Sequence, residues 1–121
     1  MATVEEYAKQ PFEARLARMT RTPDELAAAI HDRSDAVLSR RPDPKNWAAK
    51  EVVCHLRDTE EVFFVRFHAI VENNEPKMYF QRQRAGIRGD RRITIDEFVS
   101  VMAWHDDNHL DQLKRALEGR P

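Results

Sequence analysis

Two histidines lie one helical turn apart near the carboxyl end of the sequence, in the segment WHDDNHLDQL. Residues four apart on an α-helix share a face, so the side chains of His105 and His109 point the same way and can bind one metal ion. Both positions continue an apolar face that includes Phe98, Met102 and Leu113. Two neutral imidazoles buried there without partners would carry a desolvation cost, and a shared cation explains both.

A third ligand would complete such a site, and His55 is the candidate. It lies beside the apolar stripe of a long predicted helix, residues 47–72. Three imidazoles leave at least one coordination position for water or substrate, which is typical of a catalytic metal site. A hydrogen bond to a carboxylate explains a single histidine at such an edge equally well. On the same helix, His68 is expected at the surface, and Cys54 is expected to pack without binding metal.

Acidic side chains beside the histidines suggest how the imidazoles would be oriented. Asp58 follows His55 by three residues, and Asp106 and Asp107 lie between the other two histidines. A carboxylate that accepts the second ring N–H of a metal-binding histidine fixes the orientation of that ring. Asp58 or Asp106 would also be the general base if the site activated water.

An arginine cluster lies between the two histidine-bearing segments, at Arg82, Arg84, Arg88, Arg91 and Arg92. Arginine binds carboxylates through paired hydrogen bonds, so Arg82, Arg84 and Arg88 are candidates for binding a thiol cofactor or an acidic substrate. A solvated loop is the alternative explanation. Nucleic-acid binding is disfavoured, because few aromatic residues accompany the arginines.

Hydrophobic spacing predicts helices for nearly all of the remaining chain. Thr22 and Pro23 are typical of a helix start, which predicts a first long helix over residues 22–39 after an irregular arm and a short helix. The last helix is expected from a capping Thr94 to the turn before Gly119. The fold class is therefore all-α, and the segment 73–93 has no clear helical pattern.

Composition limits the class of protein. The chain has 121 residues, 41% of them hydrophobic and 34% charged, which fits a single domain over residues 1–121. Twenty basic and 21 acidic residues give a formal charge of −1, so the net charge favours neither nucleic acid nor an anionic membrane. A single cysteine excludes an internal disulfide, and no signal peptide or membrane span is visible, so a cytoplasmic location is expected.

Two segments resemble the DinB-like superfamily. NWAAKEVVCHLRDTEEVFFVRFHAI is similar to the second helix of that family, and GDRRITIDEFVSVMAWHDDNHLDQLKRAL is similar to its last helix, with the pattern H...H..QL. The resemblance implies an antiparallel up-down four-helix bundle that is often a homodimer. It also implies that His55, His105 and His109 bind a divalent metal. The third helix would be shortened to something like Met78–Arg84, missing from the sequence, or replaced by a partner subunit; we favour a shortened connection in a homodimer.

The resemblance further implies a metal-dependent enzyme that uses a low-molecular-weight thiol in a transfer reaction on small molecules. Imidazole ligands suit zinc or nickel best, with iron or manganese as further options. Two alternatives stay open. In one, the site serves a metal-dependent hydrolase; in the other, the chain is a metal-stabilised helical dimer without catalytic activity.

Overall fold

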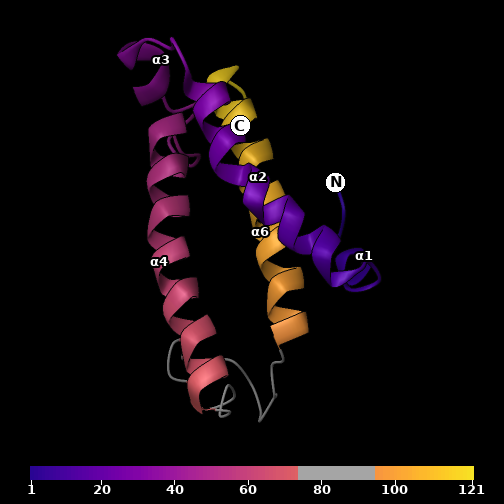
Figure 1. Ribbon diagram of the computed structural model, residues 1–121. Helices are drawn as coiled ribbons and strands as arrows, with labels where there is room; N and C mark the ends of the chain where they lie inside the picture. The colour runs from indigo at the N-terminus through magenta and orange to yellow at the C-terminus, as the bar shows by residue number, and fades with distance from the viewer. Residues whose placement is uncertain (74–94) are drawn as a thin grey trace.

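The computed structural model describes residues 1–73 and 95–121, and all regular elements in those ranges are helices. Figure 1 shows their arrangement. The helices are α1 (Val4–Ala8), α2 (Phe12–Ile30), α3 (Asp35–Ser39), α4 (Ala49–Asn73) and α6 (Ile95–Leu117). The predicted all-α fold class is confirmed.

Helix α6 is the element on which α1, α2 and α4 pack, while α3 packs on α4. Helix α6 runs antiparallel to α4 and in the same direction as α2 (Figure 1). More of the surface of α6 is buried than the single apolar face predicted from the sequence, because Val99, Ser100 and Ala103 are also buried. The face that carries the histidines is therefore only one of several packed faces of α6.

Two apolar clusters hold α6 in place along its length. The first joins α4 to the C-terminal half of α6 through Ala49, Val52, Leu56, Leu113, Ala116 and Leu117. The second gathers Phe98, Val99 and Met102 at the other half of α6, against Phe12, Met19 and Phe63. His105 and His109 lie between the two clusters in the sequence of α6, so apolar packing on both sides fixes the helix segment that carries them.

Buried arginines join α2 to α6, which the sequence did not indicate. Arg15 donates to the backbone oxygen of Asp96 at 2.8 Å and to Ser100 Oγ at 2.7 Å. Arg18 pairs through Nε with Asp107 Oδ1 at 2.5 Å, and the hydroxyl of Tyr7 also donates to Asp107. Burial and the Asp107 carboxylate raise the pKa of Tyr7 to about 12, so its hydroxyl stays protonated.

The predicted first helix is wrong in its boundaries. Pro23 lies inside α2, and the chain breaks at Asp32, whose φ is +56°, before Ser34 caps α3 by accepting from the Val37 amide at 3.2 Å. Thr22 is buried, and its hydroxyl donates to Asp106 Oδ2 at 2.6 Å instead of capping a helix. Contacts with α6 thus outweigh the local preference for a helix start at Thr22.

Hydrogen bonds define the N-terminal end of α4 and the C-terminal end of α6. At the first turn of α4, the Glu51 carboxylate accepts from the Ala48 amide at 2.8 Å. Helix α6 ends as predicted before Gly119, which has a φ of +73°. The Arg120 and Gly119 amides donate to the oxygens of Arg115 and Ala116, a Schellman arrangement.

Several predicted features lie outside the described residues. They are the shortened third helix at Met78–Arg84, the Thr94 cap and the arginine cluster of Arg82, Arg84, Arg88, Arg91 and Arg92. Among the helices that are described, none has the length and apolar character needed to cross a membrane.

Replacing Asp107 with asparagine should destabilise the protein, because the buried Arg18 would lose one of its two carboxylate partners and keep only Glu25, at 2.9 Å. We expect Asp107→Asn to lower the free energy of unfolding by about 2 kcal/mol, measured by urea denaturation. Asp111→Asn is the matched control, since Asp111 is exposed and pairs with Arg115 at the surface of α6. Equal stability of the two variants would contradict the anchoring role of Asp107.

Candidate metal centre

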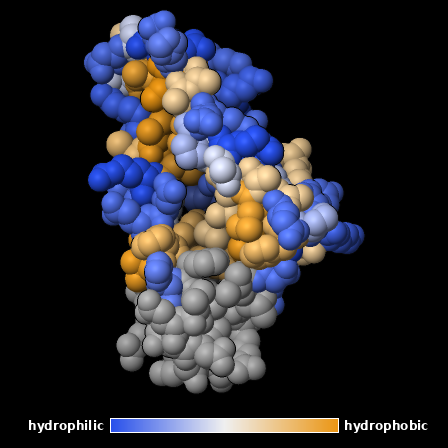
Figure 2. Space-filling model, viewed as in Figure 1, coloured by the Kyte–Doolittle hydropathy of each residue, from blue (hydrophilic) through white to orange (hydrophobic). Residues whose placement is uncertain are grey.

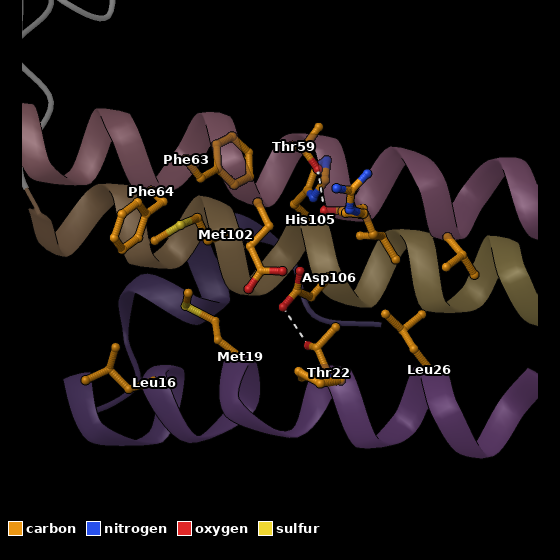
Figure 3. A pocket seen from close by; sticks show the side chains of 15 residues that line it. Leu16, Met19, Thr22, Leu26, Thr59, Phe63, Phe64, Met102, His105 and Asp106 are labelled. Carbon is orange, nitrogen blue, oxygen red and sulfur yellow. Dashed lines mark hydrogen bonds between the residues drawn. The ribbon is translucent and has the colours of Figure 1, made fainter.

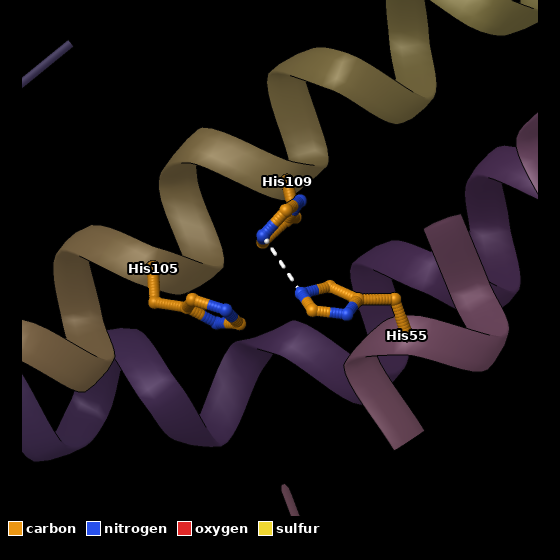
Figure 4. Close-up of side chains that lie close together, drawn as sticks. All are labelled: His55, His105 and His109. Atoms are coloured by element: carbon orange, nitrogen blue, oxygen red, sulfur yellow. Dashed lines mark hydrogen bonds between the residues drawn. The ribbon is translucent and has the colours of Figure 1, made fainter. Parts of the chain in front are cut away.

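Three imidazoles from two helices converge on one point. His55 projects from α4, and His105 and His109 project from successive turns of α6 (Figure 4). One ring nitrogen of each lies within 4.8 Å of the others, and His55 Nε2 is 3.1 Å from His109 Nε2. The three side chains are half-buried, which agrees with the predicted edge position of His55, whereas His105 and His109 are less buried than predicted. The helix pairing therefore brings together the predicted set of ligand atoms.

Gln112 orients one of the three rings. His109 Nδ1 lies 2.7 Å from Gln112 Oε1, which can only accept, so Nδ1 carries the proton and donates it. The lone pair of His109 is then on Nε2, the nitrogen that faces His55. Such a hydrogen bond to the second nitrogen is the usual support of a metal-binding histidine. Three imidazole nitrogens, with the ring of His109 oriented by Gln112, fit a divalent metal ion.

Aromatic rings enclose the imidazoles. The Trp47 ring lies with its centroid 4.9 Å from that of His55 and 6.5 Å from that of His109. The Phe63 ring lies 5.2 Å from His105, edge to face. These rings limit the freedom of the imidazoles and reduce their contact with water, which strengthens electrostatic interactions at the site.

The site favours the neutral form of His55. Burial lowers the pKa of His55, and the neighbouring His109 lowers it further, while Asp58 acts in the opposite direction. A metal ion binds only the neutral imidazole. His55 is therefore ready to bind at neutral pH without first losing a proton.

The acidic residues predicted to orient the histidines lie differently. Asp106 accepts from Thr22, and burial raises the pKa of its carboxyl to about 6. Asp107 accepts hydrogen bonds from Arg18 on α2 and from Tyr7 on α1, and it thereby joins both helices to α6. Asp58 is exposed and lines an open groove beside His55. Instead of these carboxylates, Gln112 accepts a hydrogen bond from one of the three imidazoles, that of His109.

The two remaining histidines and Cys54 are all exposed. His68 is exposed, as expected, and the fifth histidine of the chain, His31, lies at the end of α2 with 78% of its side chain exposed. Cys54 is also exposed, so the prediction that it packs in the interior is wrong. It precedes His55 on α4 and lines the same open groove.

A comparison with known families decides where the chain belongs. Residues 18–86 match the family model of the DinB superfamily, more than half of the chain. The chain belongs to the DinB superfamily. The match includes His55 but ends before α6, so the place of His105 and His109 in this DinB protein rests on the geometry of the site. No curated protein and no solved structure matches the chain.

Sequence reasoning missed two residues of the centre. Gln112 lies three positions after His109 on the same helix face, a spacing that brings side chains together, and this was the available signal. Trp47 was visible only as part of the family pattern, because its contact with two histidines depends on how α4 meets α6.

The affinity of the site for metal should fall as the pH is lowered. Protons compete for the imidazole nitrogens, so we expect zinc bound tightly at about pH 7.5 to be released as the pH falls to about 5. The lowered pKa of His55 moves the loss of that ligand to the lower part of this range. Competition with a fluorescent zinc indicator at each pH measures the affinity. Undiminished affinity at about pH 5 would contradict binding by three imidazoles.

Gln112 should contribute to affinity without touching the ion. Gln112→Met removes the acceptor for His109 Nδ1–H while keeping the side-chain length, and we expect zinc affinity to fall roughly 10- to 100-fold. Gln112→Glu retains an acceptor oxygen and is the matched control, with affinity close to that of the wild type. The same indicator competition applies, and equal affinity in all three proteins would contradict the orienting role.

Proposed function

We propose that this DinB protein is a metal-dependent enzyme that activates a low-molecular-weight thiol and transfers it to a small molecule. The observation that carries the proposal is the convergence of three imidazole nitrogens within 4.8 Å of one another, with His55 also lining an open groove. Zinc or nickel suits three nitrogen ligands best. A divalent ion held there would lower the pKa of a bound thiol or water enough to give a nucleophile near neutral pH.

The open side of the centre supports a polar thiol as the nucleophile. A groove of about 610 Å³ adjoins His55 and is lined by polar and charged residues that include Arg41, Lys50 and Asp58. Arg41 pairs with Glu51, and Lys50 lies 3.7 Å from Asp35. The groove thus carries both signs of charge, which suits a zwitterionic thiol such as a cysteine derivative better than a simple anion.

The residues of the chain would have distinct roles in this reaction. His55, His105 and His109 hold the ion, Gln112 orients His109, and Trp47 limits access of water. In the transfer, the sulfur forms a bond to an electrophilic carbon of the substrate, the leaving group departs with its electron pair, and the thiol proton passes to solvent. In this proposal Asp58, which is exposed and lines the groove beside His55, accepts the thiol proton first and passes it on to solvent.

Two alternative functions, a hydrolase and a protein without catalytic activity, predict different experimental results. A hydrolase would use Asp58 or Asp106 as the base, and the raised pKa of Asp106 fits a group that exchanges protons near pH 6. Such an enzyme would cleave small esters without added thiol. A metal-stabilised helical protein without activity would lose thermal stability on chelation and catalyse neither reaction.

Thiol transfer can be measured with a simple electrophile. We expect the zinc- or nickel-loaded protein to accelerate the reaction of cysteine or glutathione with 1-chloro-2,4-dinitrobenzene, followed by product absorbance. His55→Ala should abolish the acceleration. His31→Ala is the matched control, since His31 is exposed and outside the centre, and it should keep full activity.

Measuring ester hydrolysis beside thiol transfer distinguishes a thiol transferase, a hydrolase and a protein without activity. Acceleration that needs both thiol and His55 supports thiol transfer. Cleavage of 4-nitrophenyl acetate without thiol, lost in His55→Ala, would favour the hydrolase. Equal rates with wild type and His55→Ala in both assays would contradict a catalytic role.

A further inference from the structure

A second cavity adjoins the metal centre on the side of His105. It has a volume of about 430 Å³ and lies between α2 and α4, which both pack on α6. This volume is in the range of small-molecule binding sites. His105 lines the cavity as well as the metal centre, whereas His55 and the open groove lie on the other side.

The lining of this cavity is mainly apolar. Figure 3 shows side chains from all three helices pointing into it, and in Figure 2 apolar residues border the hollow between α2 and α4. They include Met19, Leu26, Val53, Leu56, Phe63 and Met102. A space of this character lowers the free energy of a ligand that brings apolar surface out of water.

The polar residues of the lining do not offer a binding site for an anion. Thr22 and Asp106 are hydrogen-bonded to each other at 2.6 Å. Arg57, the cationic residue among the described lining residues, is exposed and lies 3.7 Å from Glu61. Asp106 and Glu60 add only acidic groups. A carboxylate or phosphate would therefore lose its hydration here without gaining a free cation.

We propose that this cavity binds the apolar part of the second substrate, an alkyl or aryl group of a small uncharged electrophile. The identification of the occupant as a substrate rests on the proposed function; the binding of an apolar group does not. Each of the two cavities then binds one of the two reactants. The polar groove beside His55 admits the thiol, and the apolar cavity places the electrophile against His105.

Binding can be tested without any reaction. The uncharged fluorophore N-phenyl-1-naphthylamine serves as the probe, and n-alkanols from butanol to octanol displace it. We expect the affinity of the alkanols to rise about fourfold for each added methylene until the cavity is filled. Sodium alkanoates of the same lengths should displace the probe much more weakly, because the cavity offers no free cation.

Two substitutions fill the cavity from opposite walls. Met19→Trp on α2 and Val53→Phe on α4 should each remove most of the dependence on chain length. Val65→Phe is the matched control, because Val65 is exposed on α4 and does not line the cavity. Helical circular dichroism and zinc binding confirm that each variant is folded; if one is not, the other carries the test.

The outcome separates this inference from the proposed function. His109→Ala removes a metal ligand that does not line the cavity, so chain-length dependence should persist while zinc binding is lost. Persistence of alkanol binding together with a failure of thiol transfer would overturn the function and leave the apolar site standing. Absence of probe binding, or the same length dependence in the filled variants and in Val65→Phe, would overturn the inference. Probe binding that is lost as the protein becomes a dimer would mean that a second copy of the chain covers the cavity, and this result too would overturn the inference.

Discussion

The centre depends on holding three imidazole nitrogens close together while all three stay unprotonated. Protonated rings at these distances would repel one another, and rings held this close have less room for hydrogen bonds to water. The pairing of α4 with α6 imposes this crowding, with His55 Nε2 at 3.1 Å from His109 Nε2. A divalent cation satisfies all three lone pairs at once, which makes metal binding the simplest account of the arrangement.

The rest of the fold serves to keep α6 in register with α4. The apolar clusters on either side of the histidines prevent α6 from sliding or turning, because either motion would open cavities around Phe98 or Leu113. Arg15 and Arg18 fix the opposite face of α6 to α2 through Asp96 and Asp107. Apolar packing thus sets the distance between the ligand-bearing helices, and charged hydrogen bonds set the position of α2 and with it the wall of the apolar cavity.

The sequence was informative where a pattern is repeated along one helix. The spacing of His105 and His109, the stripe of Val52 and Leu56, and the glycine after α6 each follow from local geometry, and each is found in the structure. The placement of His55 beside them also followed, because it lies at the edge of an apolar stripe that had to meet the last helix.

Features that depend on contacts between distant residues could not be predicted. Thr22 and Pro23 look like a helix start, but a hydrogen bond to Asp106 on α6 keeps this segment within a continuous α2. Arg15 and Arg18 look like surface residues until their partners on α6 are known. The roles of Gln112 and Trp47 and the apolar cavity arise in the same way, from how three helices meet.

The most direct test of this account is the metal content of untagged protein, measured by inductively coupled plasma mass spectrometry beside a His105→Ala, His109→Ala double variant. The account predicts close to one divalent metal ion per chain in the wild type and almost none in the variant. Equal and negligible metal in both proteins, after purification without chelators and dialysis against zinc or nickel, would contradict it.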